Sequence, residues 1–430
     1  MSVGGYPQPF GPYELLRPLG RGGMAEVFLA SAPAVSGDRR LVALKRMHQG
    51  VGEDQGAVDM LIEEARLAMR FEHRNIAATY ELGCHEGVYF FVMEYVDGLD
   101  LGTVARAAES LGERLPPATV ARIVAGVARG LHHAHTLADE DGRLLGVVHR
   151  DVSPQNVLVN RRGEVKLIDF GVAKVATRIQ QTMAGIIKGK YAYMSPEQAS
   201  AEPIDARSDV FSLGICLWEL LTGQPLFRRP EMSSPFAILR AVREEPITRI
   251  DVLAPDVGQE LGDLVQRALE RDVQARLGSA GELADALEAW LGRHAPAYDN
   301  AALCRTLADL VARAPDGTLP ERVIATPPVE KMSDEAFVPS LLSVVARSPL
   351  ELADADTDRR PRRGRHAPAL ALEAPPPAAA RPSAVANAEI VRDLRPGRRT
   401  TLQLLWVGVF ALIFAFGWSV VATLKRLGKI

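Results

Sequence analysis

The sequence predicts an α+β domain that fills most of the 430-residue chain. From about Tyr13 to Leu291, strand-like runs, amphipathic runs of helical period and turn signals alternate. Residues 60–71 (MLIEEARLAMRF) repeat apolar side chains at helical spacing, whereas Val88–Val96 (VYFFVMEYV) is rich in the β-branched and aromatic residues typical of strands. Both kinds of element therefore belong to one domain.

The composition changes after His294. Residues 366–382 (HAPALALEAPPPAAARP) form a Pro/Ala tract that cannot bury enough surface to fold. Leu402–Leu424 contains 23 residues without a charge, enough for a helix about 34 Å long that crosses a hydrocarbon core of about 30 Å. A buried core helix is the alternative, but a core helix of this length normally carries a polar stripe. We therefore predict one transmembrane helix.

The predicted organisation has five segments. Short apolar patterns between His294 and the Pro/Ala tract, such as Ala301–Val311 and Ala336–Val345, are interpreted as isolated helices. Basic residues flank both ends of the apolar run, so the positive-inside rule favours a cytosolic N-terminus only slightly. The expected segments are an N-terminal extension (1–12), the α+β domain (13–292), a largely disordered juxtamembrane linker (293–401), the transmembrane helix (402–424) and a short tail (425–430).

Composition excludes some functions. The formal net charge of −3 argues against a nucleic-acid binder, which needs a concentrated basic surface. Cys84, Cys216 and Cys304 lie far apart without metal-ligand spacing, so we expect reduced thiols and no disulfide.

A glycine-rich run near the N-terminus suggests a phosphate-binding turn. Residues 19–27 read L-G-R-G-G-M-A-E-V, and such a turn between two strands lets backbone N–H groups approach phosphate oxygens. Alone it is more often a plain turn. It resembles the protein kinase pattern G-x-G-x-x-G-x-V through Gly20, Gly22 and Val27, with Ala25 in place of the third glycine. No G-K-[ST] follows, which excludes a P-loop.

The next strand strengthens the resemblance to protein kinases. Residues 42–45 (V-A-L-K) match the kinase V-A-I-K, and the helical run that follows carries Glu63 and Glu64. The resemblance implies that one carboxylate pairs with Lys45 and holds its ammonium against the α- and β-phosphates of ATP. The family places this glutamate just before an alanine, which selects Glu64.

Val88–Val96 resembles the hinge of a kinase, with Met93 as gatekeeper. The resemblance implies that the backbones of Glu94 and Val96 address the adenine, that Asp100 meets the ribose, and that Leu158 packs on the base. The full set of nucleotide-contacting residues implied in this way is Leu19, Gly20, Arg21, Gly22, Gly23, Met24, Ala25, Glu26, Val27, Ala43, Lys45, Glu64, Glu94, Val96, Asp100 and Leu158.

The decisive motifs are V-V-H-R-D-V-S-P-Q-N-V-L-V-N at residues 147–160 and K-L-I-D-F-G at residues 166–171. They resemble the kinase catalytic loop and D-F-G motif at the family's spacing. The resemblance implies a two-lobed kinase fold in which Asp151 accepts the hydrogen of the substrate hydroxyl, while Asn156 and Asp169 bind Mg²⁺ or Mn²⁺. His149 is interpreted as a structural residue.

Two departures from the family pattern occur together. The position two beyond the catalytic aspartate, usually a lysine in Ser/Thr kinases, is Ser153, and the substrate-binding loop has Lys190 where a threonine is usual. We interpret this as an exchange in which the Lys190 ammonium replaces the missing lysine near Asp151. The alternative is that the two positions changed independently of each other and that Lys190 faces solvent.

The remaining motifs concern regulation and the lower lobe. Arg150 could pair with a phosphate on the activation segment, whose threonines are Thr182, the first candidate for autophosphorylation, and Thr177. By resemblance, Asp209 steadies the catalytic loop. Arg276 is expected to form a buried ion pair with Glu197.

The resemblance covers about two-thirds of the chain and implies a bacterial eukaryotic-like (Hanks-type) Ser/Thr protein kinase. Such a kinase would use ATP and Mg²⁺ to phosphorylate protein substrates. The apolar helix would anchor it in the cytoplasmic membrane. Dimerisation through the kinase domain or through the apolar helix is left open. The rival is a membrane-tethered pseudokinase scaffold, supported by Ser153 and Ala25 but opposed by the retained metal ligands. A small-molecule kinase is disfavoured by the full activation segment, and tyrosine specificity by the substrate loop.

Overall fold

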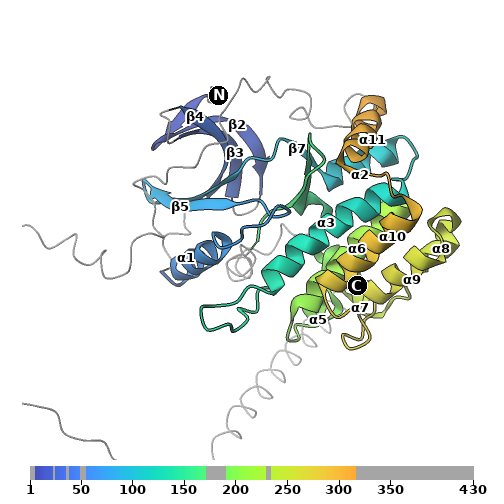
Figure 1. The fold of residues 1–430 in the computed structure, drawn as a ribbon. Coiled ribbons are helices and arrows are strands. Elements are labelled where there is room, and N and C mark those ends of the chain that lie inside the picture. Colours follow the sequence, from blue (N-terminus) through green and yellow to red (C-terminus); the bar gives the residue numbers. More distant parts are fainter. Residues whose placement is uncertain are drawn as a thin grey trace, which may run out of the picture. The chain divides into compact units, whose positions relative to one another are not determined.

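A six-stranded antiparallel sheet forms the N-terminal lobe (Figure 1). The computed structural model describes residues 5–22, 25–34, 38–48, 55–170, 190–228 and 234–315. The sheet has the strand order β1-β2-β3-β4-β6-β5. Its strands are β1 (Gln8–Phe10), β2 (Tyr13–Arg21), β3 (Ala25–Pro33), β4 (Arg39–Met47), β5 (Thr79–His85) and β6 (Val88–Glu94).

The two faces of this sheet bury different side chains. Because side chains alternate along a strand, Val42 and Leu44 of β4 pack with Phe90 in one apolar cluster, and Ala43 and Lys45 point to the other face. Helix α1 (Gln55–Ala68) contributes Leu61 and Ala65 to the second cluster, together with residues of β4, β5 and β6. The helix therefore packs on the same face of the sheet toward which Lys45 points.

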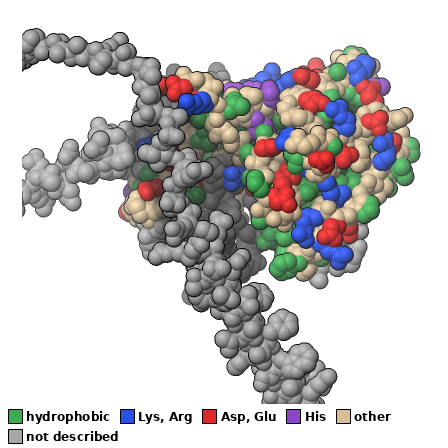
Figure 2. Space-filling model, turned by 90° about the horizontal axis from the view of Figure 1, so that it is seen from below, with side chains coloured by type: hydrophobic (Ala, Val, Ile, Leu, Met, Phe, Trp, Pro, Cys, Tyr) green, Lys and Arg blue, Asp and Glu red, His purple; other side chains and the backbone are tan. Residues whose placement is uncertain are grey.

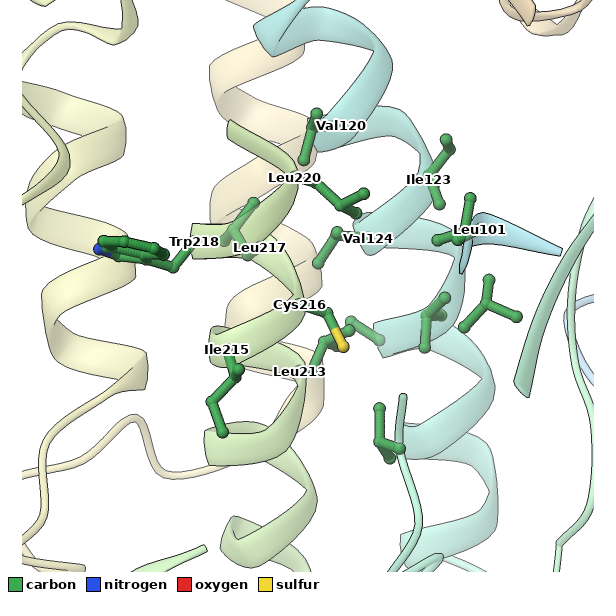
Figure 3. Close-up of a cluster of buried hydrophobic side chains, with 14 of the residues drawn as sticks. Leu101, Val120, Ile123, Val124, Leu213, Ile215, Cys216, Leu217, Trp218 and Leu220 are labelled. Atoms are coloured by element: carbon green, nitrogen blue, oxygen red, sulfur yellow. The ribbon is translucent and has the colours of Figure 1, made fainter. Parts of the chain in front are cut away.

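The C-terminal lobe is helical and is built around two long helices, α3 (Pro117–His135) and α6 (Ala206–Thr222). Figure 3 shows Val120 and Val124 of α3 on the side that faces Leu217 and Leu220 of α6. Nearly every residue of α6 is buried, including the polar Ser208, Asp209 and Ser212. The other helices are α2 (Leu101–Ser110), α5 (Pro196–Ala199), α7 (Pro235–Glu244), α8 (Ile250–Leu253), α9 (Gln259–Ala268), α10 (Ala280–His294) and α11 (Asn300–Arg313).

A small three-stranded sheet joins the segment after β6 to the strands that follow the catalytic loop. It consists of β7 (Gly98–Asp100), β8 (Val157–Asn160) and β9 (Val165–Leu167), paired antiparallel in that order. The α+β, two-lobed fold predicted from the sequence is confirmed.

Folded elements lie beyond both limits of the predicted domain. Strand β1 pairs with β2, so the extension expected at 1–12 contributes to the sheet. The limit at residue 292 falls inside α10, and α11 buries Leu303, Leu307 and Leu310 in the core of the helical lobe. The helix predicted at Ala301–Val311 exists but is not isolated, because its apolar stripe is covered by the lobe. The first part of the predicted linker is thus folded.

Among the residues that the structure describes, no helix is both long and apolar enough to cross a membrane. The predicted span, Leu402–Leu424, lies outside the described residues, as do the linker from residue 316 onward and the tail. All three cysteines are free thiols. On the face shown in Figure 2, basic and acidic side chains are interspersed over the helical lobe, consistent with the chain's small net charge.

Candidate active site

Lys45 pairs with Asp169 across the two lobes. Its side chain leaves β4 on the face covered by α1, and its ammonium lies 2.7 Å from Asp169 Oδ1. Among the described residues, Lys45 forms an ion pair with Asp169, whereas the sequence led us to expect Glu64. The ammonium thus pairs with the carboxylate of the D-F-G motif, which comes from a residue 124 positions away in sequence.

Of the two neighbouring glutamates of α1, Glu63 and Glu64, only Glu64 is buried on the side of the sheet toward which Lys45 points. Glu64 lies on the buried face of the helix and is 7% exposed, whereas the Glu63 side chain is 70% exposed and pairs with Arg66. Glu64 therefore faces the interior on the same side of the sheet as Lys45, as the sequence predicted.

The turn that carries Asp169 has an unusual backbone. Asp169 has a φ of +63°, a left-handed conformation that costs energy for a residue with a side chain and tends to persist at functional sites. The next residue, Phe170, is buried with its ring 4.8 Å from that of Phe71 and 4.5 Å from that of His149. Packing of Phe170 on both sides thus holds the strained turn and points Asp169 toward Lys45.

Asp151 is oriented by Asn156. The Asn156 Nδ2 donates to the backbone oxygen of Asp151 at 2.7 Å and to its Oδ2 at 2.9 Å. Because the amide nitrogen is used in this way, the Asn156 side-chain oxygen is directed away from Asp151. The Asp151 carboxylate and the amide oxygen of Asn156, the last residue of the short turn η2 (Pro154–Asn156), therefore lie close together.

Asp209 fixes the backbone before Asp151. Its Oδ1 accepts from the Arg150 N–H at 2.8 Å, and its Oδ2 accepts from the His149 N–H at 2.7 Å. His135 Nε2 lies 2.8 Å from the same Oδ2. Arg150 has a φ of +69°, so the carboxylate stabilises a strained backbone. This is the role that the sequence predicted for Asp209.

His149 is fully buried and uses both ring nitrogens. Its Nε2 lies 3.0 Å from the Ile168 carbonyl, which can only accept, and its Nδ1 accepts from the Asp151 N–H at 3.3 Å. The imidazole therefore links the catalytic loop to the D-F-G turn, in agreement with its structural interpretation.

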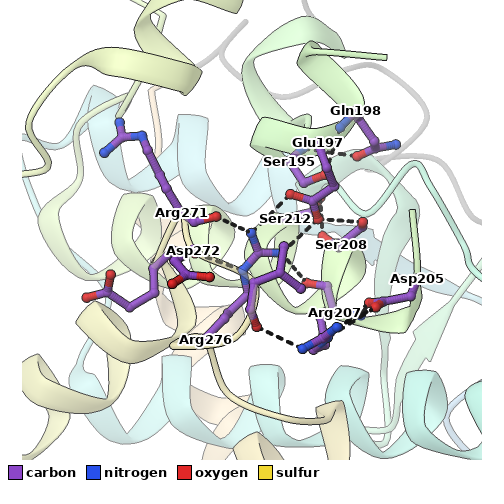
Figure 4. Close-up of polar contacts among 12 residues, drawn as sticks. Ser195, Glu197, Gln198, Asp205, Arg207, Ser208, Ser212, Arg271, Asp272 and Arg276 are labelled. Atoms are coloured by element: carbon purple, nitrogen blue, oxygen red, sulfur yellow. Dashed lines mark hydrogen bonds and ion pairs between the residues drawn. The ribbon is translucent and has the colours of Figure 1, made fainter. Parts of the chain in front are cut away.

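The residues of the S-P-E-Q motif tie the end of the activation segment to this loop. Ser195 caps α5 by accepting from the Gln198 N–H, and Gln198 Nε2 donates to the Arg150 carbonyl at 3.0 Å. Glu197 forms a two-pronged ion pair with Arg276, with distances of 2.8 and 3.0 Å, and also accepts from Ser208 (Figure 4). The buried ion pair expected from the sequence is present.

The residues predicted to contact the nucleotide lie in two parts of the chain, the glycine loop and the hinge. Gly20 and Val27 pair across β2 and β3, and the Gly22 N–H donates to the Ala25 carbonyl at 2.8 Å, which closes the turn of the glycine loop. Ala25 is 6% exposed and packs with Met47, so a small side chain is accommodated where the family has glycine. Gly23 and Met24 lie outside the described residues.

Charged residues of the loop have partners within the lobe. Glu26 bonds Arg46 across β3 and β4 at 2.8 Å, and Arg21 lies 3.3 Å from Glu26. The hydrogen bond from Arg46 lowers the pKa of Glu26. Glu26 thus links β3 to β4 through its ion pair with Arg46.

The hinge residues are held by contacts that the sequence does not reveal. The Glu94 N–H donates to the Ala78 carbonyl at 2.8 Å, and its carboxylate pairs with Lys166 at 2.9 Å. Asp100 caps α2, accepting from the Thr103 N–H at 2.8 Å and hydroxyl at 2.7 Å. An aspartate before a helical run is a recognised capping signal, so this role could have been found from the sequence.

Ser153 is 4% exposed and directly precedes η2, so the position usually held by lysine is filled by a small buried side chain. The backbone of Lys190 begins a short 3₁₀ turn, η3 (Lys190–Tyr193), but its side chain lies outside what the structure describes. Residues 171–189, with Thr177 and Thr182, are outside the described residues as well.

The donor set fits a magnesium nucleotide. Asn156 and Asp169 supply amide and carboxylate oxygens, the ligands that Mg²⁺ takes in small number while phosphates and water complete its coordination. Lys45 lies next to Asp169, where its ammonium can meet phosphate oxygens. The Asp151 carboxylate is held by the Asn156 amide beside this donor set, which suits a group that accepts a hydroxyl hydrogen.

Comparison with known proteins agrees with this geometry. The family described as "Protein kinase domain" matches residues 13–288. The tyrosine-protein kinase MasK of Myxococcus xanthus is 41% identical over 287 residues, covering 67% of this chain and 44% of that protein. The serine/threonine-protein kinase PknH of Mycobacterium bovis is 34% identical over 321 residues, covering 74% of this chain and 50% of that protein.

A solved structure also matches. A mutant of the Mycobacterium tuberculosis PknI kinase domain superposes with a TM-score of 0.51 at 27% identity, covering 68% of this chain and 100% of that one. This chain spans about half or less of the length of MasK and PknH. The matched region contains the sheet, the catalytic loop and the D-F-G turn described above, and on these grounds the chain belongs to the protein kinase family.

Proposed function

We propose that the chain is an active protein kinase that transfers the γ-phosphoryl group of Mg·ATP to serine or threonine hydroxyls of proteins. The observation that carries the proposal is the joint placement of Asp151 with Asn156 and of Lys45 with Asp169. A scaffold that only binds nucleotide has no need to retain the carboxylate that faces the substrate hydroxyl.

In this mechanism the protein positions groups and stabilises charge. Asp151, held by the Asn156 amide, accepts the hydrogen of the incoming hydroxyl and aims its oxygen at the γ-phosphorus. Lys45 orients the α- and β-phosphates. Bound Mg²⁺ supplies neutralisation of the phosphate charge through Asn156 and Asp169.

The acceptor amino acid is the finer part of the proposal. PknH is named a serine/threonine kinase and MasK a tyrosine kinase, so transfer to tyrosine is the second candidate. The substrate loop, which lacks the proline-containing segment typical of tyrosine kinases, favours serine and threonine. Incubation of the full chain with labelled Mg·ATP and mixed protein substrates, followed by phosphoamino-acid analysis, decides between them. Label found on tyrosine alone would overturn the serine/threonine assignment.

We further propose that Lys190 supplies the ammonium missing at position 153. Lys190→Ala is then expected to lower kcat by about 10²-fold, the typical loss when one group that stabilises the transition-state charge is removed. Lys188→Ala, in the same loop, is the matched control and should leave kcat within about twofold. Steady-state assays with a protein substrate measure both variants, and equal rates would show that Lys190 merely faces solvent.

Autophosphorylation of Thr182, with Thr177 as the second candidate, is proposed as the activating event. Arg150 Nε is buried and has no hydrogen-bond partner among the described residues, so the guanidinium can still receive a phosphate. Mass-spectrometric mapping of the chain after incubation with Mg·ATP tests this, and unmodified Thr182 and Thr177 in an active sample would contradict it.

We also propose that Leu402–Leu424 tethers the kinase to the cytoplasmic membrane, with the catalytic domain in the cytoplasm. The support is the uncharged run of 23 residues. Expressed in bacteria, the full chain should sediment with membranes after carbonate washing, whereas a variant lacking 402–424 should stay in the supernatant. A full chain that stays in the supernatant would refute the tether.

A further inference from the structure

The turn between β8 and β9 is hydrogen-bonded to the end of the hinge. The Arg161 N–H donates to the Asp97 carbonyl at 3.2 Å, and Arg161 Nε donates to the Asp97 carboxylate at 2.8 Å. Asp97 directly follows the hinge residue Val96 in sequence. The next residue, Gly98, lies so close to β8 that a Cβ there would be 2.1 Å from the Val159 carbonyl. Backbone and side chain thus fasten the hinge to this turn.

The same turn is in direct contact with α11. Gly163, with a φ of +74°, lies so near the start of the helix that a Cβ on it would be 2.4 Å from the Asn300 carbonyl. The Cys304 thiol donates to the Arg161 carbonyl at 3.2 Å. Arg161 therefore contacts the hinge with its N–H and guanidinium and α11 with its carbonyl.

Helix α11 is itself rigidly held by the helical lobe. Its apolar stripe of Leu303, Leu307 and Leu310 is buried. Tyr298, just before the helix, has its hydroxyl 2.6 Å from that of Thr119 and 3.0 Å from that of Thr306.

Two guanidinium contacts fix the ends of the helix. Arg122 of α3 donates to Asn300 Oδ1 at 2.8 Å, and Arg313 pairs with Glu113, which follows α2. Figure 1 shows α11 beside α2, the helix capped by Asp100. The helix thus rests on α3 and on α2, whose cap Asp100 is predicted to meet the ribose.

We propose that α11, acting through the β8–β9 turn, holds the hinge in its nucleotide-binding position. Arg161, Gly163 and Asn300 are then positioning residues for ATP, and the functional kinase domain extends to residue 313. The inference rests on the proposed use of ATP. It goes beyond the family match, which ends at residue 288, before α11 begins.

The first test uses two neighbouring arginines in the full chain. The Arg161 side chain is 65% exposed and pairs with Asp97, whereas that of Arg162 is 75% exposed and pairs with Glu164 within the turn. Arg161→Ala should raise the KM for ATP and the Kd for Mg·ADP about threefold, the upper range for an exposed ion pair, with kcat within about twofold. Arg162→Ala should change none of these values.

The second test separates collision with α11 from backbone strain. Gly163→Ala introduces both, whereas Gly87→Ala, in the β5–β6 turn at a φ of +77°, meets nothing within 4 Å and introduces strain alone. Gly163→Ala should raise the Kd for Mg·ADP by about tenfold more than Gly87→Ala does, because the turn and hinge must move. Far-ultraviolet circular dichroism verifies that both variants fold.

Calorimetric titration with Mg·ADP keeps this inference separate from the proposed function. If the wild type binds Mg·ADP but transfers no phosphate, the proposed activity fails while the four variants still test the hinge. If Arg161→Ala and Gly163→Ala bind Mg·ADP as tightly as their matched controls, α11 does not position the hinge and the inference is overturned.

Discussion

Replacement of Asp151 by asparagine is expected to lower kcat by about 10³-fold, within the range for loss of a general base. Asparagine has nearly the same shape, and the Asn156 amide that now donates to Asp151 Oδ2 can donate to its carbonyl oxygen instead. The loop should keep its conformation, so the Kd for Mg·ADP should change by less than about threefold. Steady-state kinetics and calorimetry on the full chain measure the two quantities.

Asp141→Asn is the matched control, because Asp141 lies in an exposed loop that precedes the catalytic loop in sequence. It should have wild-type kcat. An Asp151→Asn enzyme that retained a tenth or more of the wild-type kcat would show that another group accepts the hydroxyl hydrogen.

Arg276→Met is expected to destabilise the helical lobe by about 3–5 kcal/mol, the cost of leaving a buried carboxylate without its cation. Glu197 and Arg276 are 5% and 4% exposed, and the guanidinium also donates to the carbonyls of Arg207 and Glu270. Urea unfolding followed by circular dichroism measures the loss in the free energy of unfolding.

An exposed ion pair provides the control. Arg267→Met removes a partner of Glu282 in a pair whose side chains are 56% and 43% exposed, and should cost less than about 1 kcal/mol. The double variant Glu197→Gln with Arg276→Met should recover part of the loss, since no buried charge remains. If Arg276→Met and Arg267→Met lowered the free energy of unfolding equally, the buried ion pair would contribute no more to stability than the exposed one.

The same pair predicts a pH dependence of stability. Burial raises the pKa of Glu197, but hydrogen bonds from Arg276 and Ser208 outweigh burial, and the net pKa is lowered. A carboxylate with a lowered folded-state pKa contributes stability above its unfolded pKa, and this contribution is lost as pH falls through the folded value. The wild type should therefore lose more stability on acidification than the double variant.

The chemistry-bearing residues could be predicted because they stand in compact motifs. Asp151 and Asn156 are five positions apart, and Asp209 was assigned from a helix start that the family shares. The strained φ values at Arg150 and Asp169 were not predicted; packing of Phe170 and the bonds to Asp209 maintain them.

Contacts between distant parts of the chain could not be predicted in the same way. The pairing of Lys45 with Asp169 depends on the relative position of the two side chains in the folded cleft. Helix α11 was visible as an apolar pattern, but the pattern does not say which surface covers it. The link from Asp97 through Arg161 to Cys304 joins residues 64 and 143 positions apart, and no local signal marks it.

The most direct test of the central claim is incorporation of labelled phosphate by the full chain supplied with Mg·ATP and a protein substrate. An active kinase should label itself and the substrate, with incorporation abolished by chelation of Mg²⁺ and by Asp151→Asn. A chain that binds Mg·ADP in calorimetry yet labels neither itself nor any substrate would contradict the account and identify a pseudokinase scaffold.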